Sequence, residues 1–231
     1  MRLINATMPR SGSEFVSKLI LQSLHRRPEC IVSITPGRNI NHQACLCSSP
    51  FEQESSIFRN AERSITAMQK VSSFLLKIES PGRDTLCMDI AERCTDILWL
   101  CSLRNIEDIV ISHYNLKSWG WTEDKVLQAW KNDLFFYEFL HNKKRLLAVD
   151  IDNPDSLSPE RFCQFLGLDQ LPDAAEQAIA SWGVVNPLKQ QKEKAGEAMG
   201  ARLVPESIST IRFRHPWIEA LESRYQALLC A

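Results

Sequence analysis

The sequence predicts an α/β domain of three layers, with helices on both sides of a mostly parallel central sheet. Short apolar runs alternate with amphipathic segments through residues 2–168, the pattern of right-handed βαβ units. The run from Asp96 to Ser102 is almost continuously apolar, as expected for a strand covered on both faces. The first apolar run leads through a short turn straight into a helix. We expect one domain over residues 1–231, with the core sheet in 2–168 and a helical C-terminal part in 169–231.

The composition excludes several classes of protein. The chain has 231 residues, of which 44% are hydrophobic and 24% charged, which is typical of a folded globular domain rather than a disordered one. A net charge of −1 gives no support for general nucleic-acid binding. No apolar run reaches the roughly 20 residues needed to span a bilayer. Because the first expected strand begins at the second residue, we expect no signal peptide. We expect a cytoplasmic protein that binds neither nucleic acid nor membrane.

The eight cysteines are expected to be reduced thiols in such a protein. His42, Cys45 and Cys47 are the one candidate metal cluster, and they lack a fourth nearby ligand. The sequence therefore predicts no metal site.

Each expected strand is an apolar or β-branched run, and turn-forming pairs such as Pro36-Gly37 and Pro81-Gly82 mark where such runs end. The expected strands are Leu3–Thr7, Cys30–Ile34, Ser73–Ile78, Asp96–Ser102 and Arg145–Val149. Each expected helix has apolar residues three and four apart, and Thr122 is an expected N-cap. The expected helices are Glu14–Leu24, Ser56–Lys70, Thr85–Arg93, Ile106–Leu116, Glu123–His141, Pro159–Leu166, Ala174–Trp182 and His215–Leu229. The polar residues 36–55 are expected to form a long loop.

The first candidate site is the turn that joins the first strand to the first helix. The N–H groups of a first helical turn lack partners inside the helix, and the helix dipole adds positive charge there, so the turn is suited to bind an anion. We expect the backbone N–H groups of residues 11–14 to hold it. The binding residues expected here are Pro9, Arg10, Ser11, Gly12, Ser13, Glu14 and Phe15. An alternative is an ordinary strand–turn–helix corner, in which Ser11 and Glu14 form a capping box.

The second candidate site follows the apolar run that ends at Ser102. Arg104 comes at the carboxyl end of this expected strand, where a guanidinium can bind a phosphate with two parallel hydrogen bonds. Ser112 lies eight residues further, in the next helix, and is expected to meet the same anion. The alternative is that Arg104 pairs with Glu107 or Asp108.

Together, these two segments resemble the sulfotransferase family, which transfers a sulfuryl group from 3′-phosphoadenylyl sulfate (PAPS). The segment Pro9-Arg10-Ser11-Gly12-Ser13-Glu14-Phe15 resembles the loop that binds the 5′-phosphosulfate, in the form of carbohydrate sulfotransferases. The segment from Arg104 to Ser112 resembles the one whose arginine and serine hold the 3′-phosphate, with Ile106 in place of the usual proline. The resemblance implies the P-loop NTPase-like sulfotransferase fold. It also implies PAPS as donor without a metal, and a carbohydrate or small-molecule acceptor with a hydroxyl or amine.

Two shorter matches extend the resemblance. Lys77-Ile78-Glu79-Ser80-Pro81 is similar to the family's Lys-Thr-His-Leu-Pro strand end, and Phe165-Leu166-Gly167-Leu168 to the segment after the last core strand. The histidine is the family's catalytic base, and carbohydrate-acting members use a glutamate. The resemblance thus implies Glu79 as the base and Arg10 as the second catalytic residue. Lys77 is expected to point to the other face of its strand, and the alternatives are a solvated lysine or an ion pair with Glu79.

Two departures from the family pattern keep other functions open. Glu14 replaces a hydroxyl residue in the first loop, and the late Arg-Lys-Gly loop is not evident. One alternative is a small-molecule kinase, although the turn lacks the first glycine and the Gly-Lys pair of a kinase P-loop. The other is a nucleotide-binding or scaffold protein without catalysis.

Overall fold

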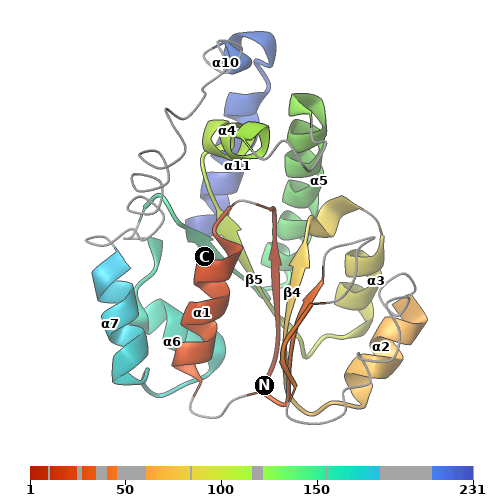
Figure 1. Ribbon diagram of the computed structural model, residues 1–231, viewed down its shortest axis with the longest axis vertical. Coiled ribbons are helices and arrows are strands. Elements are labelled where there is room, and N and C mark those ends of the chain that lie inside the picture. Colours follow the sequence, from red (N-terminus) through yellow and green to blue (C-terminus); the bar gives the residue numbers. More distant parts are fainter. Residues whose placement is uncertain are drawn as a thin grey trace.

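The computed structural model has a six-stranded sheet in the order β3-β2-β4-β1-β5-β6 (Figure 1). It describes residues 1–9, 11–24, 28–34, 41–45, 61–83, 85–115, 122–153, 156–182 and 210–230. All neighbouring strands are parallel except β3, which runs antiparallel to β2 at one edge. The strands are β1 (Arg2–Thr7), β2 (Cys30–Ile34), β3 (Asn41–Cys45), β4 (Phe74–Glu79), β5 (Leu98–Leu103) and β6 (Leu146–Asp150). The predicted mostly parallel sheet is confirmed.

Strand β1 lies between β4 and β5, which places the turn that follows it in the middle of the sheet edge. Thr7, the last residue of β1, is paired with Glu79, the last residue of β4. The pairing of β1 with β5 runs from Leu3–Leu98 to Asn5–Leu100. Ligands of parallel sheets bind beyond the carboxyl ends of the strands, so this edge is where a site is expected.

Helices cover both faces of the sheet, in agreement with the predicted three layers (Figure 1). They are α1 (Ser13–Ser23), α2 (Ala61–Gln69), α3 (Leu86–Arg93), α4 (Ile106–Asn115), α5 (Glu123–Asn142), α6 (Pro159–Leu166), α7 (Asp173–Trp182), α10 (Ile211–Arg214) and α11 (Ile218–Ala227), with short 3₁₀ turns η2 (Pro81–Arg83) and η5 (Leu228–Cys230). Local signals fix several ends. The expected Thr122 cap accepts from the Lys125 N–H, and Gly167 ends α6 with a positive φ of 66°.

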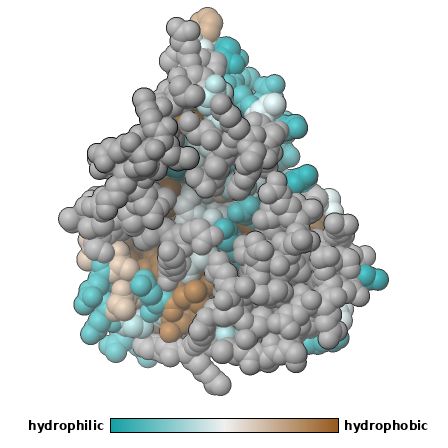
Figure 2. Space-filling model, in the orientation of Figure 1, coloured by the Kyte–Doolittle hydropathy of each residue, from teal (hydrophilic) through white to brown (hydrophobic). Residues whose placement is uncertain are grey.

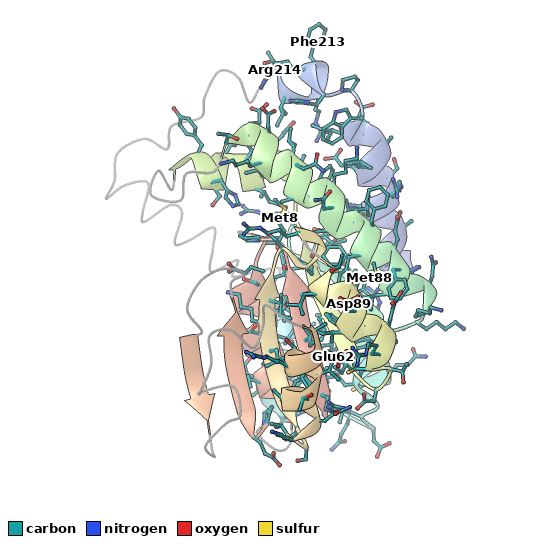
Figure 3. The ribbon with its side chains drawn as sticks, turned by 90° about the vertical axis from the view of Figure 1, so that its right-hand side faces the viewer. Met8, Glu62, Met88, Asp89, Phe213 and Arg214 are labelled. Atoms are coloured by element: carbon teal, nitrogen blue, oxygen red, sulfur yellow. The ribbon has the colours of Figure 1, made fainter. Side chains whose placement is uncertain are left out.

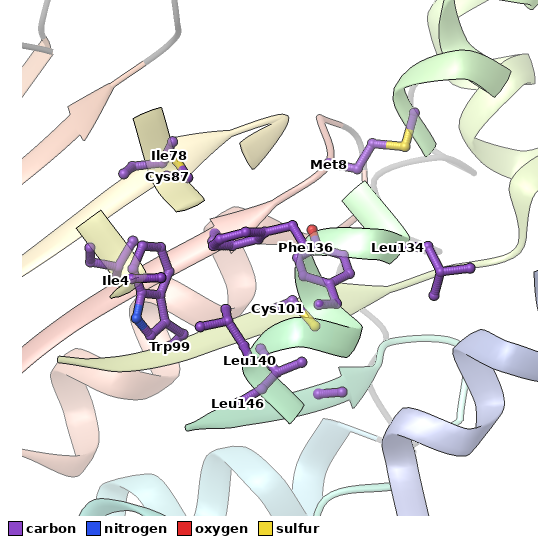
Figure 4. Packing of buried hydrophobic residues seen from close by; sticks show 14 of the residues in the cluster. Ile4, Met8, Ile78, Cys87, Trp99, Cys101, Leu134, Phe136, Leu140 and Leu146 are labelled. Carbon is purple, nitrogen blue, oxygen red and sulfur yellow. The ribbon is translucent and has the colours of Figure 1, made fainter. Parts of the chain in front are cut away.

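The alternation of side chains along each strand divides the core into two layers. On one face, Leu3, Leu75 and Leu100 pack under α1 together with residues of α6 and α7. The opposite face carries Ile4, Trp99 and Cys101 in a larger cluster with α2 to α5 and α11 (Figure 4). Met8, just after β1, lies between the sheet and the helices α4 and α5 (Figure 3). The turn after β1 is therefore anchored in the core.

Two expectations about secondary structure are wrong. The expected loop 36–55 contains β3, a polar edge strand that shows no apolar alternation by which the sequence could reveal it. The expected helix His215–Leu229 begins at Ile218 instead, because Pro216 disfavours helical backbone at the residue before it, and a separate short helix, α10, precedes it. Residues 56–60 of an expected helix lie outside the described residues.

The described surface includes a hydrophilic edge along α5 and α10 (Figure 2). In the described ranges, no helix combines the length and the apolar character needed to cross a membrane. The four cysteines whose side chains are described are all free thiols: Cys87, Cys94, Cys101 and Cys163.

Candidate functional site

The candidate site lies where β4, β1 and β5 end. Side chains two residues apart in a strand share a face, so the polar residues at these ends all lie on the face that α1 covers. Four of them are buried although polar, namely Asn5, Thr7, Lys77 and Ser102. Buried polar groups need partners, and the contacts below show where these find them.

The turn after β1 presents the start of α1 to the sheet edge. Gly12 is the N-cap with φ 96°, and the first helical hydrogen bond runs from the Val16 N–H to the Gly12 carbonyl, at 3.2 Å. The N–H groups of residues 12–15 therefore come before the first N–H that donates to a carbonyl within the helix. Ser11 differs, because its N–H already donates to the Met8 carbonyl at 3.3 Å. The set of N–H groups available to an anion thus begins one residue later than the expected 11–14.

Ser11 does not form the capping box that was the alternative for this turn. Its hydroxyl donates to the Met8 carbonyl at 2.6 Å and lies 2.7 Å from Thr7 Oγ1 and 2.9 Å from Ser102 Oγ. Thr7 Oγ1 also contacts Ser102 Oγ. These hydroxyls bind the turn to the ends of β1 and β5, and the cap position belongs to Gly12.

Asn5 supports the first turn of α1 from beneath. Its side-chain amide donates to the Ser13 carbonyl and to Ser17 Oγ, both at 2.9 Å. Asn5 is fully buried, so these bonds are shielded from water and fix the helix start against β1.

Gly12 has no room for a side chain. A Cβ there would lie 2.7 and 2.8 Å from Ile151 side-chain carbons, and φ 96° is unfavourable for any other residue. Gly167 makes a matched control, since it also has a positive φ but has nothing within 4 Å of an added Cβ.

We therefore expect Gly12→Ala to destabilise the protein more than Gly167→Ala. The free energy of unfolding should fall by about 1 kcal/mol in Gly167→Ala, because only the backbone is strained. It should fall by about 2–4 kcal/mol in Gly12→Ala, because Ile151 must also move. Urea unfolding measures both. Equal losses of stability in the two variants would show that Ile151 moves aside without destabilising the protein.

Glu79, the candidate base, is the last residue of β4 and lies beside Thr7. Its Oε1 is 3.4 Å from Lys77 Nζ, and the two side chains are 12% and 10% exposed. The expectation that Lys77 points to the other face is wrong, because residues two apart in a regular strand share a face. The ion pair that was one of the alternatives is what forms.

The chain after Glu79 is held at two points. Ser80 has a positive φ of 52°, and its N–H donates to the Thr7 carbonyl at 3.0 Å. Two residues on, the Gly82 N–H donates to Asp133 Oδ1 of α5 at 2.7 Å, and an added Cβ at Gly82 would lie 2.3 Å from α5 backbone atoms. Burial raises the pKa of Asp133 to about 8, although the Gly82 hydrogen bond works against this rise. The chain just after Glu79 is thus tied to a buried carboxyl group of α5.

Arg104 follows the end of β5 and is 5% exposed. Its guanidinium lies 3.3 Å from Asp108 Oδ2 and 3.8 Å from Asp152 Oδ1, so the pairing with Asp108 that was the alternative for this residue forms. Glu107, the other candidate partner, pairs instead with Arg212. Asp152 also accepts from the Asn105 N–H, which ties the start of α4 to the chain after β6. Ser112 is buried in α4, two turns into the helix.

The remaining predicted residues are described only in part. Pro9 and Ser13 are buried, within or beside the turn. Arg10 lies outside the described residues, as do the side chains of Glu14 and Phe15. The same holds for the side chains of His42, Cys45 and Cys47.

Two residues of this region were missed by sequence reasoning. Ser102 is the polar end of an otherwise apolar strand, two residues before Arg104. Asp133 lies on the apolar stripe of α5, three residues after Trp130 and four before Tyr137, where a carboxylate is unexpected. A polar residue in a buried pattern was the available signal in both cases.

A solved structure with the same architecture is the mouse sulfotransferase SULT7A1 complexed with PAP. The similarity has a TM-score of 0.50 at 14% sequence identity and covers 78% of this chain. The chain has the sulfotransferase fold. It spans 64% of the length of the mouse sulfotransferase. No protein-family model matches the sequence, and no curated protein matches it.

Proposed function

We propose that this chain is a cytoplasmic enzyme that transfers a sulfuryl group from PAPS to a hydroxyl or amine of a carbohydrate or small-molecule acceptor. One observation supports this most. The Ser11 and Ser102 hydroxyls are 2.9 Å apart, so the turn after β1 and the strand end that carries Arg104 lie together at one sheet edge. This closeness supports the proposal that the two segments hold the two phosphates of one nucleotide, in a chain with the sulfotransferase fold.

The donor would be bound by both segments. Backbone N–H groups at the start of α1 would take the phosphosulfate, as helix starts take anions generally. Arg104 and Ser112 would hold the 3′-phosphate and so select PAPS over ATP. Asp108 and Asp152 support the Arg104 part of this proposal, since they orient a guanidinium that is otherwise buried. Phe15 would lie near the adenine.

The transfer would be an in-line displacement at sulfur, in which positioning and charge stabilisation dominate. Glu79 would accept the proton of the acceptor while the acceptor oxygen or nitrogen bonds to sulfur. The bond from sulfur to the 5′-phosphate oxygen would break, and adenosine 3′,5′-bisphosphate would leave. Arg10 would stabilise the charge on that leaving oxygen, and Lys77 would orient Glu79 through their ion pair.

Thermal unfolding with different nucleotides tests the choice of donor. We expect adenosine 3′,5′-bisphosphate at 100 times its Kd to raise Tm by roughly 5–10 °C. ATP with Mg²⁺ at the same concentration should raise it far less. A larger shift with ATP and Mg²⁺ would favour a kinase instead.

Release of bisphosphate from PAPS, measured over a panel of sugars, phenols, alcohols and amines, then tests catalysis. Acceptor-dependent release is expected. Bisphosphate binding without release for any acceptor would contradict the enzyme and favour a nucleotide-binding scaffold.

A further inference from the structure

The buried hydroxyls of Thr7, Ser11 and Ser102 form a cluster that we call the hydroxyl latch. It joins three points of the backbone: the end of β1, the turn after it and the end of β5. All three side chains are at most 2% exposed, so water does not compete for these contacts. The latch lies between the two segments proposed to bind the donor.

The latch does not itself offer a donor to a ligand. Three hydroxyls carry three protons, and Ser11 uses its own on the Met8 carbonyl. The protons of Thr7 and Ser102 remain for the contacts inside the cluster. All three hydroxyl protons are therefore used within the cluster or on the Met8 carbonyl, and the role of the cluster is to hold backbone segments in place.

The sheet alone does not hold these two strand ends together. The backbone pairing of β1 with β5 ends at Asn5–Leu100, two residues before Thr7 and Ser102. On its other side, β1 is paired with β4 as far as Thr7, and β5 is paired with β6 as far as Leu103. Beyond the last backbone pair, the side-chain contacts of the latch join β1 to β5.

We propose that Ser102 is a positioning residue that keeps the phosphosulfate-binding turn and the Arg104 end of β5 at the spacing of one bisphosphate. This inference rests on the proposed function. A ligand with two phosphates gains most from both sites when their spacing is fixed in advance. A ligand with one phosphate needs only one site.

Binding of adenosine 3′,5′-bisphosphate, AMP and 3′-AMP by isothermal titration calorimetry to wild type and Ser102→Ala tests the latch. We expect the variant to bind the bisphosphate about tenfold more weakly, the effect of losing one or two buried hydrogen bonds. Each monophosphate should keep its affinity within about twofold. The turn retains its support from Met8 and Asn5, and Arg104 retains Asp108 and Asp152.

Two further variants separate positioning from folding. Ser102→Thr keeps the hydroxyl and should restore bisphosphate binding. Ser23→Ala removes an equally buried hydroxyl, bonded to the Leu19 carbonyl in α1, and should bind all three ligands like wild type. If Ser102→Ala does not fold, Ser102→Cys keeps nearly the same side-chain volume, replaces the hydroxyl by a weak donor and acceptor, and carries the same expectation.

The inference would be overturned if Ser102→Ala bound the bisphosphate with wild-type affinity. It would also be overturned if the variant lost the same factor of affinity for all three ligands. A wild type that binds the bisphosphate no better than AMP would instead overturn the proposed function, and the inference with it.

Discussion

Asp133→Asn is expected to stabilise the protein by an amount that grows with pH. The carboxyl group is fully buried in α5, and burial raises its pKa from 3.8 to about 8. In the unfolded chain the group ionises near pH 4, whereas in the folded protein it stays protonated until about pH 8. The unfolded state is therefore favoured increasingly as the pH rises between these values, and folding stability falls.

The expected size of this effect is large. At pH 7 the wild-type protein should be about 4 kcal/mol less stable than it would be with a group that does not titrate. Asparagine keeps the oxygen that accepts from the Gly82 N–H and cannot ionise. The groups around Asp133 are Cys101 of β5, Tyr137 of α5 and Tyr225 of α11, whose own pKa values burial raises well above their usual range, so they stay neutral at pH 7.

Urea unfolding of the wild type and Asp133→Asn at pH 4 and pH 7.5 checks this prediction. The two proteins should be similar at pH 4, and the variant more stable at pH 7.5. Asp124→Asn, on the exposed side of the same helix, serves as the control for replacing a carboxylate of α5 by an amide. If the free energies of unfolding of the wild type and Asp133→Asn differed by the same amount at both pH values, the raised pKa would be contradicted.

Arg104→Ala is expected to reduce the affinity for adenosine 3′,5′-bisphosphate about 100-fold. A guanidinium that is 5% exposed and oriented by two carboxylates can make charge-assisted hydrogen bonds to a phosphate, each stronger than a neutral one. AMP has no 3′-phosphate, so its affinity should change by less than about threefold.

Calorimetric titration of both nucleotides gives this comparison. Arg104→Lys keeps the charge but loses the planar pair of donors, and should show an intermediate loss. Arg93→Ala, which breaks an ion pair with Glu62 between α3 and α2, should bind like wild type. Unchanged bisphosphate binding by Arg104→Ala would remove the 3′-phosphate assignment.

Much of the fold follows from local sequence patterns. Strand β2 and helix α6 have their predicted bounds, because β-branched residues favour the strand and Ser158, Pro159 and Gly167 mark both ends of the helix. Strand β3 could not be predicted in this way. It is formed by pairing with β2 at the sheet edge, and its residues Asn41–Cys45 carry no apolar pattern.

The candidate site was predictable in outline only. The turn after β1 and the Arg104 segment stand out in the sequence because each combines a strand end, a basic residue and a helix start. The contacts that join them connect residues about 90 positions apart, such as Ser11 and Ser102, and no local pattern encodes such a pair. The same holds for Asp133 and Gly82, whose contact depends on how α5 packs against the turn η2 that follows β4.

A crystal structure of the protein with adenosine 3′,5′-bisphosphate tests most directly whether one nucleotide is held by both segments. We expect 5′-phosphate oxygens within hydrogen-bond distance of backbone N–H groups of residues 12–15, and the 3′-phosphate on the Arg104 guanidinium. A bisphosphate that contacts only one of these segments, or neither, would contradict the account.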